Sequence, residues 1–263
     1  LFIKGLFMKK IVLFFTLLLS ISFQKNAQWE WQNPKPTAET LRDIQFIDEN
    51  TGWAVGTFGT ILKTTNGGDN WISQSNGTSE VLFSVYFTDN QTGWVVGGHG
   101  TILKTTNGGD NWISQSSGTS RDLFSVYFTD NQTGWVAGGY TGSILKTTNG
   151  GDNWILQSNG SYGLLSVYFT DNQTGWAVGY HGTILKTTNG GDNWVSQISN
   201  TNNRLHSTYF TDNQTGWAVG EFGKILKTTN GGENWVSQSS GTSNTLWTVY
   251  FTDNQAGWAM GEL

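Results

Sequence analysis

The sequence predicts an all-β fold assembled from tandem copies of one short unit, and two observations predict it. The first is a fixed spacing, because a Gly-Trp pair recurs every 41 residues and places its tryptophans at Trp53, Trp94, Trp135, Trp176, Trp217 and Trp258. The second is composition, since 35 glycines and 14 tryptophans beside only 13% charged residues indicate many turns between aromatic-rich strands. A repeat of this length is typical of solenoids, propellers and similar arrays.

Each unit is expected to contain four strands. The copy that begins at Leu82 reads LFSVYFTD, NQTG, WVVGGHG, TILKTT, NGGDN and WISQS. Runs of β-branched and aromatic residues bounded by Gly, Asn and Asp predict strands joined by tight turns. Four short antiparallel strands per unit predict the blade of a β-propeller. We expect residues 28–263 to form five complete blades and an incomplete sixth, as part of a six- or seven-bladed ring that continues beyond Leu263.

The amino-terminal 27 residues predict an export signal preceded by a few upstream residues. Met8, Lys9 and Lys10 come before the weakly polar to apolar run 11–23, and Ala27 stands at a plausible cleavage point. The run is short for a membrane span, which needs about 20 apolar residues, although an uncleaved anchor is the alternative. We therefore expect an exported protein, periplasmic, cell-surface or extracellular in a bacterium, without a stable membrane span after cleavage. Residues 29–32 resemble a fourth strand of the repeat.

Charge and composition exclude several classes of function. A net charge of −5 without a basic patch argues against nucleic-acid binding. The absence of cysteine excludes disulfides, thiolate metal sites and a cysteine nucleophile. The three histidines, His99, His181 and His206, make a poor zinc set, and the DNQTG turns each offer one carboxylate where a calcium loop needs several ligands. We expect a monomer without metal or cofactor.

The third turn of each copy carries a recognisable motif. It reads Thr-x-Asn-x-Gly-x-x-Trp and resembles the BNR or Asp-box repeat, with Asn in place of Asp. Its residues include Thr64, Asn66, Gly68 and Trp71, then Asn107 and Trp112, Asn149 and Trp154, Asn189 and Trp194, and Asn230 and Trp235. An Asn side chain can accept backbone N–H bonds in such a turn, so we expect a structural role. Together with GWAVG and GTILKTTNGG, the motif resembles the photosystem II stability/assembly factor-like propellers. That resemblance implies a propeller fold and a role as an assembly chaperone for a membrane complex.

The copies differ mainly at the second turn and in the inter-blade loop, which a four-stranded meander places on one face. The residue before the turn's Gly, or before Thr-Gly in the third copy, is a ring in every copy: Phe58, His99, Tyr140, His181 and Phe222. Such rings could stack against sugars or peptide side chains, or could instead cap their own hairpins and pack on the next blade. Arg121, Arg204 and Glu80 join them as candidate ligand-binding residues. We interpret the following further residues as part of the inter-blade loops on the same face: Arg42, Asp43, Asp122, Tyr162, His206 and Trp247.

Two functions follow. The first is a secreted, non-catalytic scaffold that binds a protein or a glycan through the variable face. The second is a sialidase-like glycoside hydrolase, in which Arg42, Arg121 and Arg204 would clamp a carboxylate and Glu80, Asp122 or Glu221 would act on the glycosidic bond. Because the arginines stand at different distances from the repeated Phe, no catalytic residue is assigned.

Overall fold

The computed structural model describes residues 35–159, 162–253 and 255–262. The predicted export signal and the strand expected at residues 29–32 therefore lie outside the described residues. The chain divides into a unit of residues 1–35 and a unit of residues 36–263, and the fold below is that of the second unit. Within the described residues, no helix has the length and hydrophobicity needed to span a bilayer.

Five four-stranded antiparallel sheets and one two-stranded sheet make up the unit. The first contains β1 (Leu41–Phe46), β2 (Gly52–Gly56), β3 (Ile61–Thr64) and β4 (Ile72–Ser73), and the second contains β5 (Leu82–Phe87), β6 (Gly93–Gly97), β7 (Ile102–Thr105) and β8 (Ile113–Gln115). The third contains β9 (Leu123–Phe128), β10 (Gly134–Gly138), β11 (Ser143–Thr147) and β12 (Ile155–Asn159), and the fourth contains β13 (Leu164–Phe169), β14 (Gly175–Gly179), β15 (Ile184–Thr187) and β16 (Val195–Gln197). The fifth contains β17 (Leu205–Phe210), β18 (Gly216–Gly220), β19 (Ile225–Thr228) and β20 (Val236–Gln238), and the last contains β21 (Leu246–Phe251) and β22 (Gly257–Gly261).

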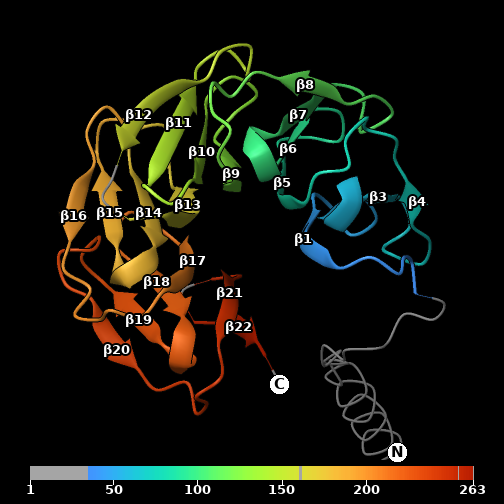
Figure 1. Cartoon of the computed structure of the whole chain (residues 1–263). Helices are drawn as coiled ribbons and strands as arrows, with labels where there is room; N and C mark the ends of the chain where they lie inside the picture. The colour runs from blue at the N-terminus through green and yellow to red at the C-terminus, as the bar shows by residue number, and fades with distance from the viewer. Residues whose placement is uncertain (1–34, 160–161, 254, 263) are drawn as a thin grey trace, which may run out of the picture. The chain divides into compact units, whose positions relative to one another are not determined.

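The prediction of an all-β propeller with five complete blades and an incomplete sixth is confirmed. Strands follow one another across every sheet in sequence order, as expected for a meander. The first strand of each sheet contacts the first strand of the next, and these strands surround a central axis while the fourth strands lie on the outside (Figure 1).

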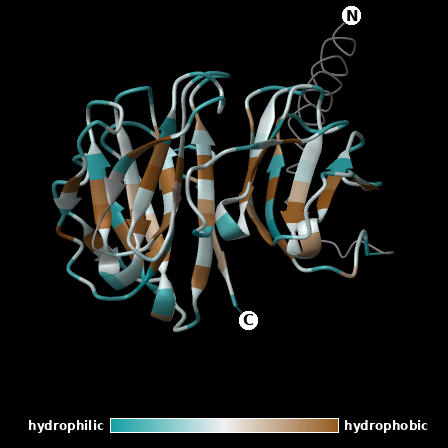
Figure 2. Cartoon of the chain, turned by 45° about the horizontal axis from the view of Figure 1, so that its top comes forward, coloured by the Kyte–Doolittle hydropathy of each residue, from teal (hydrophilic) through white to brown (hydrophobic). Residues whose placement is uncertain are grey.

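The core lies between neighbouring sheets. All five residues of β2, β6, β10, β14 and β18 are buried, because each of these second strands pairs on both edges and packs on both faces. Hydrophobic residues accordingly lie mainly on the strands, whereas many residues of the connecting loops are hydrophilic (Figure 2). The ring of Trp53 stacks on Phe87 of the next blade with centroids 3.5 Å apart, and the same pair recurs between later blades. These tryptophans therefore pack between neighbouring blades.

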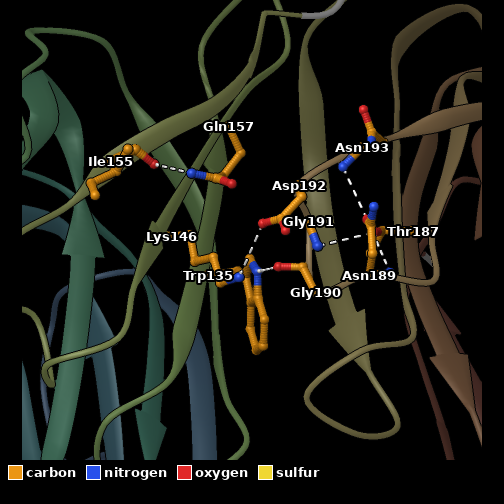
Figure 3. A network of polar contacts seen from close by, with 10 residues as sticks. All are labelled: Trp135, Lys146, Ile155, Gln157, Thr187, Asn189, Gly190, Gly191, Asp192 and Asn193. Carbon is orange, nitrogen blue, oxygen red and sulfur yellow. Dashed lines mark hydrogen bonds and ion pairs between the residues drawn. The ribbon is translucent and has the colours of Figure 1, made fainter.

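The Thr-x-Asn-x-Gly motif joins each blade to the previous one. In the fourth blade, the Gly191 N–H donates to Thr187 Oγ1 (2.9 Å) and the Asn193 N–H donates to Asn189 Oδ1 (3.0 Å), as shown in Figure 3. The turn thereby presents the carbonyl of Gly190, which accepts a hydrogen bond from Trp135 Nε1 of the third blade at 3.0 Å. The side-chain oxygen of Asn189 thus accepts a backbone N–H bond within the turn, as expected for an Asn in the place of the Asp of the Asp-box.

A lysine completes this joint. Lys146 Nζ lies 5.9 Å from the ring centroid of Trp135 and 3.5 Å from a carboxylate oxygen of Asp192 in the next blade. A cation over an aromatic face is attracted by the negative charge of the ring, so the lysine adds to the packing of the tryptophan. The lysines that recur once per blade are thus part of the fold.

Candidate functional site

Hydrogen bonds show which turns share a face. The Gly108 N–H of a third turn donates to the Gln91 carbonyl of a first turn at 2.8 Å. On the other side, the Gly59 N–H of a second turn donates to the Glu80 carbonyl of the following inter-blade loop at 2.8 Å. The second turns and the inter-blade loops therefore lie together, as the sequence predicts. We call the surface formed by these turns and loops the variable face.

Four of the five second turns are tight two-residue connections with an unusual conformation. Phe58, His99, His181 and Phe222 have φ values of 53°, 52°, 55° and 56°, and a glycine with positive φ follows each of them. This pair of left-handed residues defines a type I′ turn, which matches the twist of the hairpin but normally has Asn, Asp or Gly at its first position. A bulky side chain in the left-handed region costs about 1–2 kcal/mol. The variable face therefore holds strained rings.

The glycine after each ring cannot be replaced. A Cβ at Gly59 would lie 2.1 Å from the carbonyl oxygen of Thr78 in the inter-blade loop. The loop packs this closely because it hydrogen-bonds to the turn, through Asn76 Nδ2 to the Gly59 carbonyl at 2.6 Å. The turn and the loop thus form one unit that holds the ring outward.

The rings project into solvent. Phe58, Tyr140 and Phe222 are 74%, 71% and 71% exposed, so most of each side chain is open to solvent. Two weaker ring contacts exist on the same face, Tyr140 to Tyr180 at 6.5 Å and His181 to Tyr162 at 4.6 Å between centroids. That the rings contact a ligand stays a prediction, but their exposure makes them available to one.

On the variable face, one histidine interacts with two acidic residues. We call the part of this face formed by the second turns and the charged residues beside them the rim. His99 Nδ1 lies 2.8 Å from Glu80 Oε2, and the His99 N–H donates to Asp122 Oδ1 at 3.0 Å. The hydrogen bond with Glu80, aided by the charges of Glu80 and Asp122, raises the pKa of His99 above its ordinary value. These three residues do not make a metal centre, since no three His, Asp or Glu side chains group suitably in the part of the chain that the structure describes.

The arginines that sequence reasoning grouped have separate surroundings. Arg121 Nη1 donates to Thr141 Oγ1 at 2.5 Å, on the turn of the third blade. Arg204 places its guanidinium 4.1 Å from the ring centroid of Tyr180, with Nε 3.6 Å from Glu221 Oε1. Arg42 lines a pocket to which neither Arg121 nor Arg204 contributes. The three arginines do not form a shared clamp for a carboxylate in this structure.

The interpretation of Arg42, Asp43, His206 and Trp247 as inter-blade loop residues is wrong, since they lie within β1, β17 and β21. Arg42, His206 and Trp247 line a pocket of about 430 Å³ together with Leu41, Phe83, Phe124 and Leu165. The pocket lies among the first strands that surround the axis in Figure 1, and we call it the axial pocket. The sequence held a sign of this pocket. Six of the seven lining residues recur every 41 positions, and their side chains vary between copies, as binding residues of a repeat protein do.

Comparison with known families decides the relationship of the chain. The sequence model of the family described as photosynthesis system II assembly factor YCF48 matches residues 21–112, 73–157 and 155–240, which is more than half of the chain. The chain belongs to this family. The resemblance to photosystem II assembly factor-like propellers inferred from the repeats is thus confirmed.

Individual relatives agree with this assignment. The chloroplastic photosystem II stability/assembly factor HCF136 of Cyanidioschyzon merolae is 47% identical over 49 residues, which are 18% of this chain and 11% of that protein. The matched stretch thus spans about a tenth of the length of this curated relative.

Solved structures agree in fold. YCF48 from Cyanidioschyzon merolae is 20% identical, with a TM-score of 0.50 over 87% of this chain and 94% of that one. A YCF48 bound to D1 peptide is also 20% identical, with a TM-score of 0.49 over 86% and 92%. An ancestral GH74 enzyme is 20% identical, with a TM-score of 0.68 over 85% of this chain and 34% of that one. At such low identities the likenesses with TM-scores of 0.50 and 0.68 show the fold alone, and the likeness at 0.49 carries no argument.

Proposed function

We propose that this protein is an exported, non-catalytic propeller scaffold that binds a protein partner through the variable face. The observation that carries the proposal is the series of exposed rings on that face, of which Phe58, His99, His181 and Phe222 have the left-handed backbone conformation. Membership of an assembly-factor family supports a protein as the partner, because assembly factors act on other polypeptides.

The exposed rings suit protein recognition. Phe58, Tyr140 and Phe222 each offer a large apolar surface with few rotatable bonds, so little side-chain entropy is lost when they are covered. Aromatic residues and arginines dominate the binding energy of protein interfaces, and Arg121 and Arg204 lie on the same face. Strained backbone conformations lower stability, and in proteins they cluster at binding sites and switch regions. Their recurrence in four turns of the variable face therefore supports a role in binding.

The chemistry of the rim supports a role in binding. Glu80 and Asp122 both interact with His99, and Glu221 lies against Arg204. Carboxylates held by their neighbours in this way provide polar contacts around the rings and complete the rim of a protein interface.

The second candidate remains a glycoside hydrolase, and the propeller likeness to a GH74 enzyme is the observation that favours it. In that case Glu80, Asp122 or Glu221 would supply the acid and the base. A panel of fluorogenic sialosides and glucans tests this candidate directly. Turnover that is abolished by Glu80→Gln would replace the scaffold proposal with the enzymatic one.

The scaffold proposal is tested with a phage-displayed random peptide library. Peptides captured by the wild-type protein are synthesised, and their affinity is measured by fluorescence polarisation. We expect the triple variant Phe58→Ala, Tyr140→Ala, Phe222→Ala to bind at least tenfold more weakly, because about 1.4 kcal/mol is lost for each factor of ten and each ring contributes.

A matched control lies on the outer strands. Ile72, Ile113 and Val236 are 65%, 62% and 60% exposed, so their triple replacement by Ala removes similar exposed apolar surface from another region. Peptide binding should survive this change. Binding that is lost equally in both triple variants, or in neither, would contradict the assignment of the variable face. A glycan array run in parallel shows whether the rings prefer sugars instead.

A further inference from the structure

Six β-bulges occur at the same position of the repeat. In every first strand the pairing with the second strand skips one residue, for example Phe83, which lies between the paired residues Leu82 and Ser84. The skipped residues are Arg42, Phe83, Phe124, Leu165, His206 and Trp247. A bulge leaves one residue outside the ladder and redirects its side chain, and bulges are frequent next to binding sites.

The residues on either side of each bulge explain how it is held. The preceding residue is always Leu, and Leu82, Leu123, Leu164 and Leu205 are fully buried between blades. The following residue accepts a hydrogen bond from the next blade, as Ser125 Oγ does from the Val167 N–H at 3.1 Å. Both neighbours are therefore fixed by the fold. The bulged residue is free to vary, and it changes from blade to blade while its neighbours barely do.

The bulged side chains build two aromatic walls. Phe83 and Phe124 lie with their rings 5.1 Å apart, and His206 and Trp247 lie 4.3 Å apart. In strand order, Leu165 lies between the two aromatic pairs, and Arg42 lies on β1 at the start of the series, before Phe83. The pocket is open to solvent on one side, and its volume of about 430 Å³ lies in the range usual for small-ligand sites.

Two polar groups of the pocket have no partner. Arg42 is exposed and takes part in no hydrogen bond or ion pair among the described residues, and no carboxylate lines the axial pocket. His206 Nε2 is buried and likewise has no hydrogen-bond partner. Burial, together with the nearby charge of Arg204, lowers the pKa of His206 to about 4, so the ring is neutral at pH 7.

We propose that the axial pocket binds a small organic acid, a monocarboxylate with an aromatic or branched aliphatic body. The carboxylate pairs with the guanidinium of Arg42, which matches its two oxygens. The apolar body lies between the aromatic walls and over Leu165. Phosphate and other compact anions are disfavoured, because a single arginine among apolar side chains cannot replace their hydration. This site is distinct from the rim that the proposed function uses.

The probe is 3-phenylpropionate, titrated into the full chain and followed by calorimetry and by the imidazole NMR signals of the three histidines. We expect saturable binding that shifts the His206 signals while His99 and His181 on the rim stay unchanged. The amide of the same acid and 3-phenylpropylamine keep the apolar body and remove the negative charge. Both should bind at least tenfold more weakly, since neither can form the charge-assisted pair with Arg42.

Two arginines give a matched pair of variants. Arg42→Gln should weaken binding of 3-phenylpropionate at least tenfold, whereas Arg121→Gln removes the same charge from the rim and should leave the affinity unchanged. Trp247→Ala removes one wall and should also weaken binding. Absence of binding at millimolar probe, equal binding of the acid and its amide, or shifts confined to His99 and His181 would each overturn the proposal.

Discussion

The two faces of the propeller use the same repeat in opposite ways. On the face of the first and third turns, the blades are nearly identical, and each Asn and Trp repeats one set of contacts, such as the bond from Trp94 Nε1 to the Gly150 carbonyl at 3.0 Å. On the variable face the residues differ, and four turns hold a ring in the left-handed region. Identical copies stabilise the joints between blades, whereas the differing positions lower stability and expose side chains. Function should therefore be sought where the copies differ.

The largest effect is expected at the joints. Trp135→Ala should lower the free energy of unfolding by about 3–5 kcal/mol, because it removes a fully buried ring and the hydrogen bond to Gly190. Urea unfolding followed by far-UV circular dichroism measures the change. Trp247→Ala is the control, since this ring is 49% exposed and its loss should cost much less. If the free energy of unfolding fell by a similar amount in both variants, the distinction between tryptophans that pack between blades and the tryptophan of the axial pocket would be wrong.

A pH-dependent effect of about 2–3 kcal/mol is expected at Asp43. This residue takes the place of the serine of other blades and accepts the Val85 N–H at 2.9 Å. Burial raises the pKa of Asp43 from 3.8 to about 6. The folded chain therefore holds this proton more tightly than the unfolded chain, so the destabilisation is absent below pH 3.8, grows as pH rises, and is complete above about pH 6.

Asp43→Ser keeps an acceptor for Val85 and removes this charge. Its stability relative to wild type should increase between pH 4 and pH 7, as measured by urea midpoints at several pH values. His206 also titrates in this range, but it does so in both proteins and cancels in the difference. A constant difference across pH would show that the Asp43 carboxyl is not desolvated.

The repeated turn motif gives a smaller effect. Asn149→Ala removes the acceptor of the Asn153 N–H and of Thr147 Oγ1, and it should cost about 1–2 kcal/mol. Asn149→Asp restores the carboxylate of the Asp-box and should stay within about 0.5 kcal/mol of wild type. Thermal unfolding of the three proteins distinguishes these outcomes. Equal losses for Ala and Asp would mean that the amide group itself is needed.

The smallest effect has the opposite sign. Phe222→Asn places a residue that tolerates the left-handed region at φ 56°, so it should raise stability by about 1 kcal/mol. Phe222→Ala keeps the strain and should bring no such gain. If Phe222→Asn also weakens peptide binding, the stability lost at the variable face is linked to recognition. A stabilised variant with unchanged binding would sever that link.

The sequence predicted the fold in detail because the relevant interactions are local or recur at a fixed interval. Strand-forming runs bounded by turn residues predict the four strands of each blade. The motif predicts that Asn66 accepts a backbone N–H bond, and its Oδ1 accepts that of Asn70. The rings Phe58 and Phe222 were also found from their spacing. Their left-handed conformation was missed, although a bulky residue followed by Gly between two strands is a sign of it.

By itself, then, the sequence determined the blade, the joints between blades and the face on which the copies differ. Only the tertiary structure decided that Arg42, His206 and Trp247 meet at the axis. The reason is physical: a bulge depends on how a first strand pairs with the second, and closing a pocket requires strands separated by up to 205 positions to surround one axis. The residues next to Arg42 in the sequence determine neither the register of strand pairing nor the arrangement of the blades around the axis.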